Sequence, residues 1–363
     1  MPSVTGLDGV HVAETELSLV DGERGFLVYR GHWAKDLALQ YNYEAVVHLL
    51  LRGSLPNAEQ LSALKTQLTA GRAMSPHVQS VIDMLPGNMD MMAVLRTAIS
   101  AMGTDDYQWP PTEAQALQVL AVIPTMIAYR YHKLSGTSFP GPNAELDHVA
   151  NYLYMIHGAV PHASHVRALN AYFVLTADHG MNASTFTGRT ISSTQSDLIS
   201  AVTGAIGTMK GPLHGGAPSE VIQMLQDIGD KDHAEAWIRE KLSRGERLMG
   251  FGHRVYKTRD PRAVALRKVT EQLTGEDPWF DFALHVENTA IRLLEEYKPG
   301  RRLYTNVEFY AAAVLRTVAL PDQLFTATFT ASRAAGWTAH LLEQVPVNRI
   351  YRPQSTYTGV LPD

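Results

Sequence analysis

Residues 250–256 read Gly-Phe-Gly-His-Arg-Val-Tyr, and residues 211–217 read Gly-Pro-Leu-His-Gly-Gly-Ala. Glycines beside a histidine let backbone and ligand approach closely, because no Cβ stands in the way. Two shorter signals follow downstream, Asp260-Pro-Arg262 and Asn306-Val-Glu308-Phe-Tyr. Two imidazoles, a carboxylate and several arginines are suited to proton transfer on an anionic carbon acid. The sequence therefore points to an enzyme site built around these segments.

Around these segments, apolar residues recur with the period of an α-helix. One amphipathic face, closed by Gly53 and Pro56, carries Leu37, Val46, Val47, Leu50 and Leu51. Asn57 followed by Gln60 is a capping-box pattern that opens another helix. Further helices are expected after Asp260-Pro261 and Asp277-Pro278, which each combine an N-cap with a first-turn proline. The body of the protein is predicted to be mainly α.

Residues 7–33 have a different pattern. Short alternating stretches at 11–17 and 25–32 predict a small N-terminal β-ribbon ahead of the helices. Loop residues cluster at 103–111 and 136–143, without a low-complexity linker or an internal repeat.

Composition excludes several classes of protein. The apolar stretch Leu117 to Tyr129 is interrupted by Pro124 and indicates a buried helix rather than a membrane span. The first residues lack the basic and apolar regions of a signal peptide, so a cytoplasmic location is expected. The chain has no cysteine, which excludes disulfides, thiolate metal sites and a cysteine nucleophile.

Charge is also informative. A formal net charge of -5 argues against a nucleic-acid binder. A basic stretch nevertheless surrounds His253, which favours an anion site over an ordinary solvated surface; its cations are Arg244, Arg247, Arg254, Lys257, Arg259 and Arg262.

In these motifs the sequence resembles the citrate synthases, including the related 2-methylcitrate synthases, from about Gly6 to Gly359. The resemblance implies a two-domain, all-helical fold. Residues 1–214 and 315–363 would form a large helical domain, and residues 215–314 a small helical domain inserted into it. Closure of the small domain onto the large one would bury the site.

The resemblance also implies roles for individual residues. The catalytic residues would be His214, which steadies an enol, His253, which polarises the oxaloacetate carbonyl, and Glu308, the base. Oxaloacetate would be held by His179, Arg262, Arg333 and Arg352. The matching arginine for Arg352 reaches into the neighbouring subunit's site, which implies a homodimer. CoA would lie along Arg247, Leu248, Met249, Gly250 and Phe251, with a weaker match for Lys257 at a CoA phosphate.

Two positions depart from the family's pattern. Glu308 stands where the family has an aspartate, and its side chain is one methylene longer. Misplacement of the carboxylate on the order of 1 Å can cost roughly a hundredfold in rate. Gly180 follows His179 where the family often has a glutamate. Each of three residues also has a purely structural interpretation. Glu308 could lie on a helix surface, His214 could serve in capping or packing, and the Arg333 side chain could extend to the surface.

Other features of the sequence bear on the chemistry of these segments. His214 stands ahead of a helix through Val221, whose N-terminal dipole disfavours imidazolium. Gly250-Phe-Gly252 lacks the third glycine and the preceding strand of a dinucleotide-binding loop. His162 and His165, with His157 nearby, lack an acidic or cysteine partner at ligand spacing, so we expect no metal.

Three functions remain open. The first is a citrate synthase of the Si type that condenses acetyl-CoA with oxaloacetate and hydrolyses the thioester. The second is a 2-methylcitrate synthase that uses propionyl-CoA. The third is a catalytically weak paralogue that binds these ligands for regulation or assembly, which Glu308 and Gly180 favour and His214 opposes. In all three, no bound cofactor, membrane or nucleic acid is expected, and the partners are oxaloacetate, an acyl-CoA co-substrate and a second copy of the chain.

Overall fold

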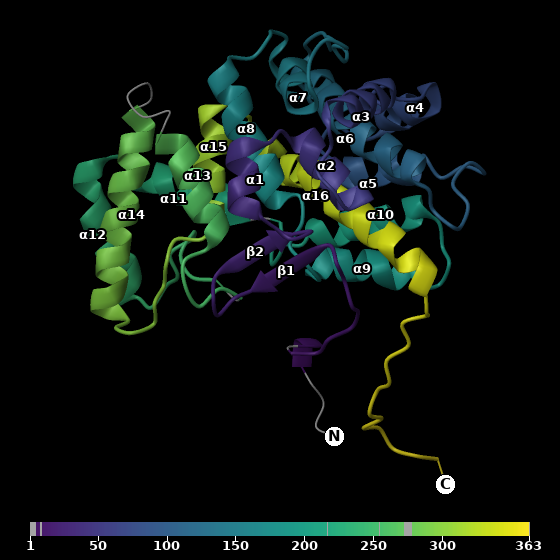
Figure 1. Ribbon diagram of the computed structural model, residues 1–363. Helices are drawn as coiled ribbons and strands as arrows, with labels where there is room; N and C mark the ends of the chain where they lie inside the picture. The colour runs from purple at the N-terminus through teal and green to yellow at the C-terminus, as the bar shows by residue number, and fades with distance from the viewer. Residues whose placement is uncertain (1–4, 8, 216, 254, 272–277, 363) are drawn as a thin grey trace.

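The computed structural model describes residues 5–7, 9–215, 217–253, 255–271 and 278–362. These residues form sixteen α-helices and one small sheet, so the predicted mainly α fold with an N-terminal β element is confirmed (Figure 1). The sheet is antiparallel with strand order β1-β2-β3; its strands are β1 (Ser18–Asp21), β2 (Phe26–Tyr29) and β3 (His32–Trp33). The predicted stretch at 25–32 thus contains β2. The stretch at 11–17 is not a strand, and β1 begins only at Ser18.

The first group of helices forms the larger part of the molecule. These helices are α1 (Ala34–Gln40), α2 (Tyr43–Arg52), α3 (Ala58–Ala70), α4 (Pro76–Met84), α5 (Met91–Ser100), α6 (Glu113–Ser135), α7 (His148–His157), α8 (Ala163–Thr176), α9 (Ala183–Ser192) and α10 (Leu198–Met209). The capping box of Asn57 and Gln60 is present at the start of α3. The amphipathic face from Leu37 to Leu51 is divided between α1 and α2, because the Asn42 side chain accepts from the N–H of Ala45 and starts a new helix.

Helix α6 contains the apolar stretch that was expected to be buried. Its residues from Ala116 to Ala128, except the half-buried Gln118, are shielded from solvent, and the helix continues through Pro124. Among the described residues, no helix is both long and apolar enough to cross a membrane.

A second group of helices follows and lies together on one side of the molecule in Figure 1. These helices are α11 (Ala217–Ile228), α12 (Lys231–Ser243), α13 (Pro261–Glu271), α14 (Pro278–Tyr297) and α15 (Val307–Thr317). Helix α13 packs against α1 and α8, and α15 packs against α8 and α11. This grouping accords with the insertion at 215–314, although the division into two domains stays a prediction. Asp277 lies outside the described residues.

The last helix, α16 (Phe325–Gln344), runs through the middle of the molecule (Figure 1). It packs against α2, α5, α6, α8, α9 and α10, and most of its residues are buried. Short 3-10 helices lie at Thr5–Leu7, Asp322–Leu324 and Val345–Val347. Beyond Val347 the chain leaves the body as an extended tail (Figure 1).

Candidate active site

The loop that carries His253 is tied to the start of α15, which carries Glu308. Phe251 forms an isolated antiparallel bridge with Thr305, and the N–H of Asn306 donates to the carbonyl of Gly250 at 2.9 Å. Gly250 has a φ of +83°, and a Cβ there would lie 3.0 Å from the side chain of Phe309. A glycine is needed at this position for both reasons. The loop and the helix end therefore form one unit.

Both ring nitrogens of His253 have defined neighbours. Its Nδ1 accepts from the backbone N–H groups of Val255 at 3.0 Å and Tyr256 at 3.1 Å. A neutral imidazole that accepts at Nδ1 carries its proton on Nε2. Nη2 of Arg262 lies 3.2 Å from this Nε2. Because a guanidinium only donates, two N–H donors meet here, and one acceptor oxygen beside the pair, within reach of both N–H groups, would satisfy both.

Arg262 is held at the start of α13. Its Nε and Nη2 donate to the two carboxylate oxygens of Asp260 at 3.1 Å and 2.9 Å, and both side chains are buried. The first helical turn is fixed by the same carboxylate, which accepts from the N–H of Arg262 at 2.9 Å. Asp260 also accepts from the N–H of Val307 at 3.2 Å. The pair therefore connects α13 to the start of α15, beside Glu308.

His179 lies on the other side of His253. Their ring centroids are 6.0 Å apart, and Nε2 of His179 is 3.1 Å from the hydroxyl of Tyr256. Gly180, where the family often has a glutamate, has a φ of +55°, and a Cβ there would be 3.1 Å from Cγ2 of Val20. The backbone turn after His179 therefore suits glycine, and a side chain at this position would press against β1.

Arg333 and His214 meet around Phe329 of α16. The Arg333 guanidinium carbon lies 4.8 Å from the Phe329 ring centroid, and the His214 ring centroid lies 6.3 Å from it. Arg333 is buried rather than extended to the surface, and its Nε donates to the carbonyl of Thr176 at 2.7 Å. The Arg333 guanidinium and the His214 imidazole therefore both lie beside the Phe329 ring.

His214 is anchored by Ser184. The hydroxyl of Ser184 is 2.8 Å from Nε2 of His214, donates to Oδ1 of Asn182 at 2.7 Å, and accepts from the Trp337 indole N–H at 3.0 Å. Both the first residues of α9 and the middle of α16 thus fix the imidazole.

The three histidines of the site are neutral at pH 7. Burial, followed by the Arg333 charge, lowers the pKa of His214 to about 4. Burial, followed by the Arg262 charge, lowers the pKa of His253 to about 4. Burial also moves the pKa of His179 well below its ordinary value, and both arginines add to this. Burial and cationic neighbours, rather than a helix dipole alone, keep these rings uncharged.

Glu308 behaves differently from a surface glutamate. Its side chain is half-buried in the first turn of α15, whose N-cap Asn306 accepts from the Glu308 N–H at 3.0 Å. Burial raises the pKa of Glu308 to about 7, against the opposing charge of Arg262. A carboxyl group that titrates near neutral pH is suited to general-base catalysis.

The remaining predicted residues lie outside this cluster. Arg352 is exposed on the tail, where its Nη1 donates to the carbonyl of Pro353 at 3.4 Å. Residues 247–251 lead into the His253 loop; Arg247 is exposed and Leu248 is buried. Lys257 is exposed four residues beyond His253, and its charge reaches the His253 ring.

Several supporting residues were not predicted from the sequence. Tyr256 lies in a quoted motif, but its contact with His179 needs the fold. Asp178 is completely buried, accepts from the N–H of Gly180 at 2.9 Å, and faces His340 of α16. His340 is seven residues beyond Arg333, on the same helix face, and that spacing is the one signal that could have been noticed.

No group of three His, Cys, Asp or Glu side chains in the described ranges is arranged to hold a metal ion. His157, for example, places its Nε2 3.0 Å from the carbonyl of Val318.

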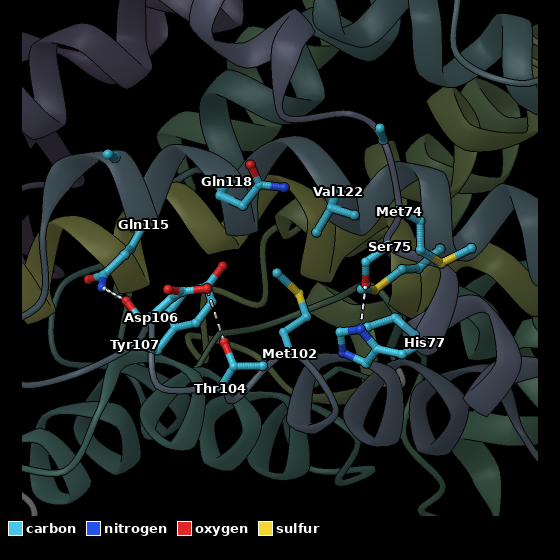
Figure 2. Close-up of a pocket in the computed structure, with 14 residues that line it drawn as sticks. Met74, Ser75, His77, Met102, Thr104, Asp106, Tyr107, Gln115, Gln118 and Val122 are labelled. Carbon is cyan, nitrogen blue, oxygen red and sulfur yellow. Dashed lines mark hydrogen bonds between the residues drawn. The ribbon is translucent and has the colours of Figure 1, made fainter.

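A separate cavity of about 420 Å³ shares no residue with this cluster. Figure 2 shows Gln115, Gln118 and Val122 along one side and Met102, Thr104 and His77 along the other. Nε2 of His77 is hydrogen-bonded to the carbonyl of Ala101 at 2.9 Å. The histidine and arginine cluster, not this cavity, contains the chemistry.

Comparison with known proteins identifies the family of the chain. A family model described as citrate synthase, C-terminal domain, matches residues 6–354. The chain is 40% identical to citrate synthase from Haloferax volcanii, over 98% of this chain and 95% of that protein. It is 37% identical to 2-methylcitrate synthase from Shewanella oneidensis, again over 98% and 95%.

Solved structures give the same result. Citrate synthase from Thermotoga maritima aligns with a TM-score of 0.88 at 34% identity, covering 99% of this chain and 96% of that one. A ternary complex of citrate synthase from Thermoplasma acidophilum with carboxymethyl coenzyme A and oxaloacetate aligns with a TM-score of 0.91 at 29% identity, with the same coverage. This chain belongs to the citrate synthase family.

Proposed function

We propose that this acyltransferase of the citrate synthase family condenses acetyl-CoA with oxaloacetate and then hydrolyses the thioester to citrate and CoA. The observation that carries the proposal is the convergence of two donors, Nε2 of His253 and Nη2 of Arg262, 3.2 Å apart. An oxygen of a keto acid placed beside this pair would accept from both. Such a site would stabilise negative charge that develops on the carbonyl oxygen during attack.

The arginines supply the affinity for a dianion. Arg262 and Arg333 are both buried, and the Nε of Arg333 donates to the carbonyl of Thr176. The planar guanidinium is well suited to carboxylates. We assign one oxaloacetate carboxylate to each of these two arginines, and His179 to a further contact. Arg352 would come from the partner subunit.

Glu308 is the proposed base. It would remove a proton from the acyl methyl group, and the half-buried position keeps its pKa near the working pH. The carbanion formed would attack the carbonyl carbon that His253 polarises. His253 then donates its Nε2 proton to the alkoxide, which becomes the new hydroxyl, and the proton that Glu308 removed restores His253. Water then cleaves the thioester to give the carboxyl group of citrate and the CoA thiol.

His214 would stabilise the enolate oxygen through Nδ1–H. That tautomer requires Ser184 to donate its proton to Nε2 of His214, 2.8 Å away, instead of to Asn182. Trp337 already donates to the Ser184 oxygen, so the hydroxyl proton is available for either acceptor. A neutral imidazole is required for this role, which accords with the lowered pKa of His214.

The acyl donor, the homodimer and a cytoplasmic location remain proposals. Relatives named citrate synthase and 2-methylcitrate synthase are similarly identical to this chain, at 40% and 37%. One methylene in an apolar pocket discriminates by only about 1–3 kcal/mol. For the homodimer, the tail exposes apolar side chains that a second copy would cover, namely those of Ile350, Tyr357, Val360 and Leu361.

Steady-state release of the CoA thiol tests the proposal directly. We expect turnover with oxaloacetate and a higher kcat/KM for acetyl-CoA than for propionyl-CoA. A reversed preference would instead favour the 2-methylcitrate synthase activity. The isosteric variant Glu308→Gln is the matched inactive control. Ligand binding without turnover by the unsubstituted chain would overturn the proposed enzyme activity.

A further inference from the structure

The turn between β1 and β2 touches the loop that carries His253. The carbonyl of Gly22 accepts from the backbone N–H of Lys257 at 2.9 Å. In Figure 1 the tip of the β1–β2 hairpin lies beside the loops that lead toward α13. Segments more than two hundred residues apart in the sequence are therefore joined by a backbone hydrogen bond next to the active site.

The contact leaves no room for a side chain. A Cβ on Gly22 would lie 2.0 Å from the carbonyl oxygen of Val255, whereas real Cβ atoms essentially never approach closer than 3.0 Å. At the other end of the turn, Gly25 has a φ of +70°, and a Cβ there would lie 2.7 Å from Cγ2 of Thr258. The turn itself is closed by Asp21, which accepts from the N–H of Arg24 at 2.9 Å. A pre-formed turn is thus fitted closely against residues 255–258.

Strand β1 of the same hairpin also supports the segment that carries His179. Ser18 of β1 donates to the Asp178 carboxylate, and a Cβ on Gly180 would lie 3.1 Å from Cγ2 of Val20 of β1. His179 stands between Asp178 and Gly180 in the sequence, and its Nε2 is 3.1 Å from the Tyr256 hydroxyl. The hairpin therefore reaches both segments, the turn of His179 through β1 and the loop of His253 through the β1–β2 turn.

We propose that the β1–β2 hairpin is a docking surface that positions the His253 loop against His179, with Gly22 as its positioning residue. The hairpin would act through two hydrogen bonds, which the backbone N–H groups of Val255 and Tyr256 donate to Nδ1 of His253. A displacement of Val255 is transmitted to the imidazole through these bonds. In the predicted domain division the hairpin belongs to the large domain and the loop to the small one, so the contact would also fix the closed arrangement.

The inference rests on the proposed function, and its test compares glycine variants of the same sheet. Gly22→Ala requires a shift of about 1 Å to restore a normal contact, and a misplacement of that size can cost roughly a hundredfold. We expect kcat/KM for oxaloacetate to fall roughly a hundredfold and its dissociation constant to rise about tenfold or more. The KM for acetyl-CoA should change less than about threefold, because residues 250–252 are held by residues 304–306 instead.

Gly31 provides the control. It lies in the turn between β2 and β3 with a φ of +82°, and a Cβ there would contact nothing within 4 Å. Gly31→Ala therefore brings backbone strain to the same sheet without touching the loop, and its kcat/KM should stay within about threefold of the unsubstituted value. Equal effects of Gly22→Ala and Gly31→Ala, with both variants folded, would overturn the inference.

If Gly22→Ala does not fold, a second pair of variants, Gly25→Ala and Gly31→Ala, tests the same inference. Gly25→Ala and Gly31→Ala carry similar left-handed strain, at φ values of +70° and +82°, but only the first meets Thr258. Thr258→Ser removes the Cγ2 atom, so Gly25→Ala combined with Thr258→Ser should recover oxaloacetate affinity relative to Gly25→Ala. No recovery would count against docking. Absence of turnover and of oxaloacetate binding in the unsubstituted protein would instead refute the proposed function.

Discussion

Nε2 of His340 lies 3.2 Å from Oδ1 of Asp178, and both side chains are completely shielded from solvent. Nδ1 of His340 accepts from Nε of Arg189 at 3.1 Å, so the proton of a neutral ring is on Nε2 and faces Asp178. Asp178 directly precedes His179. The pair therefore stabilises the turn that carries His179, a predicted substrate contact.

The first prediction concerns this pair. His340→Leu should leave Oδ1 of Asp178 buried without its facing N–H group, while Oδ2 keeps Ser18 and Gly180, at a cost of about 1–3 kcal/mol in folding free energy. It should also raise the KM for oxaloacetate by roughly tenfold, because the turn of His179 loses a fixed support. His340→Gln places an amide N–H near the former Nε2 and should recover most of the affinity. Equal KM values for the leucine and glutamine variants would show that the pair does not position His179.

The second prediction concerns the length of Glu308. Glu308→Gln should abolish both product formation and exchange of the acyl methyl protons, since an amide cannot accept the proton. Glu308→Asp distinguishes a backbone adjusted to glutamate from an awkward fit. We expect the rate to drop roughly a hundredfold, because aspartate would fall about 1 Å short of the methyl group. A faster aspartate variant would favour an unadjusted site, and normal exchange in Glu308→Gln would remove Glu308 from the mechanism.

Much of the fold could be predicted from the sequence, where the signals are local. The capping box at Asn57 and Gln60, the N-cap at Asp260 and the buried α6 all depend on neighbouring residues. The predicted strand at 11–17 was wrong because alternation alone does not provide a pairing partner; β1 pairs with β2 only from Ser18.

The site was predictable in its residue types but not in its supports. The sequence motifs identify His214, His253 and Glu308. Tyr256, Ser184 and His340 act across long sequence separations, and no local pattern indicates these contacts. The same holds for Gly22, whose need for glycine appears only when Val255 is placed against it.

The third prediction is the pH dependence of the rate. Glu308 must be ionised to act as a base, and burial raises its pKa to about 7. The value of kcat/KM for oxaloacetate should therefore fall tenfold per pH unit below about 7 and level off above it. His214 and His253, with pKa values of about 4, stay neutral throughout this range and add no limb of their own. A profile that is flat from pH 5.5 to 8.5 would contradict the assignment of Glu308.

The last prediction tests whether the site is shared between subunits. The tail leaves the body at Tyr351, whose ring stacks on Phe186 at a centroid distance of 6.1 Å and whose N–H donates to the Ser193 hydroxyl at 3.0 Å. Arg352, the next residue, is exposed, and its Nη1 donates to the carbonyl of Pro353 on the tail itself. Arg352→Ala should therefore weaken oxaloacetate binding, by roughly tenfold or more for the loss of a charged hydrogen bond, without dissociating the dimer.

Complementation makes this test independent of the size of that loss. His214→Ala and Arg352→Ala homodimers should each have low activity, because every site lacks one group. In a mixed dimer, one site combines the unsubstituted His214 of one chain with the unsubstituted Arg352 of the other, and the second site lacks both. Refolding an equal mixture should thus restore about a quarter of the unsubstituted activity, since half of the dimers are mixed and each has one intact site of two. Activity that stays at the average of the two parents, with dimers confirmed by light scattering, would place Arg352 outside the partner's site.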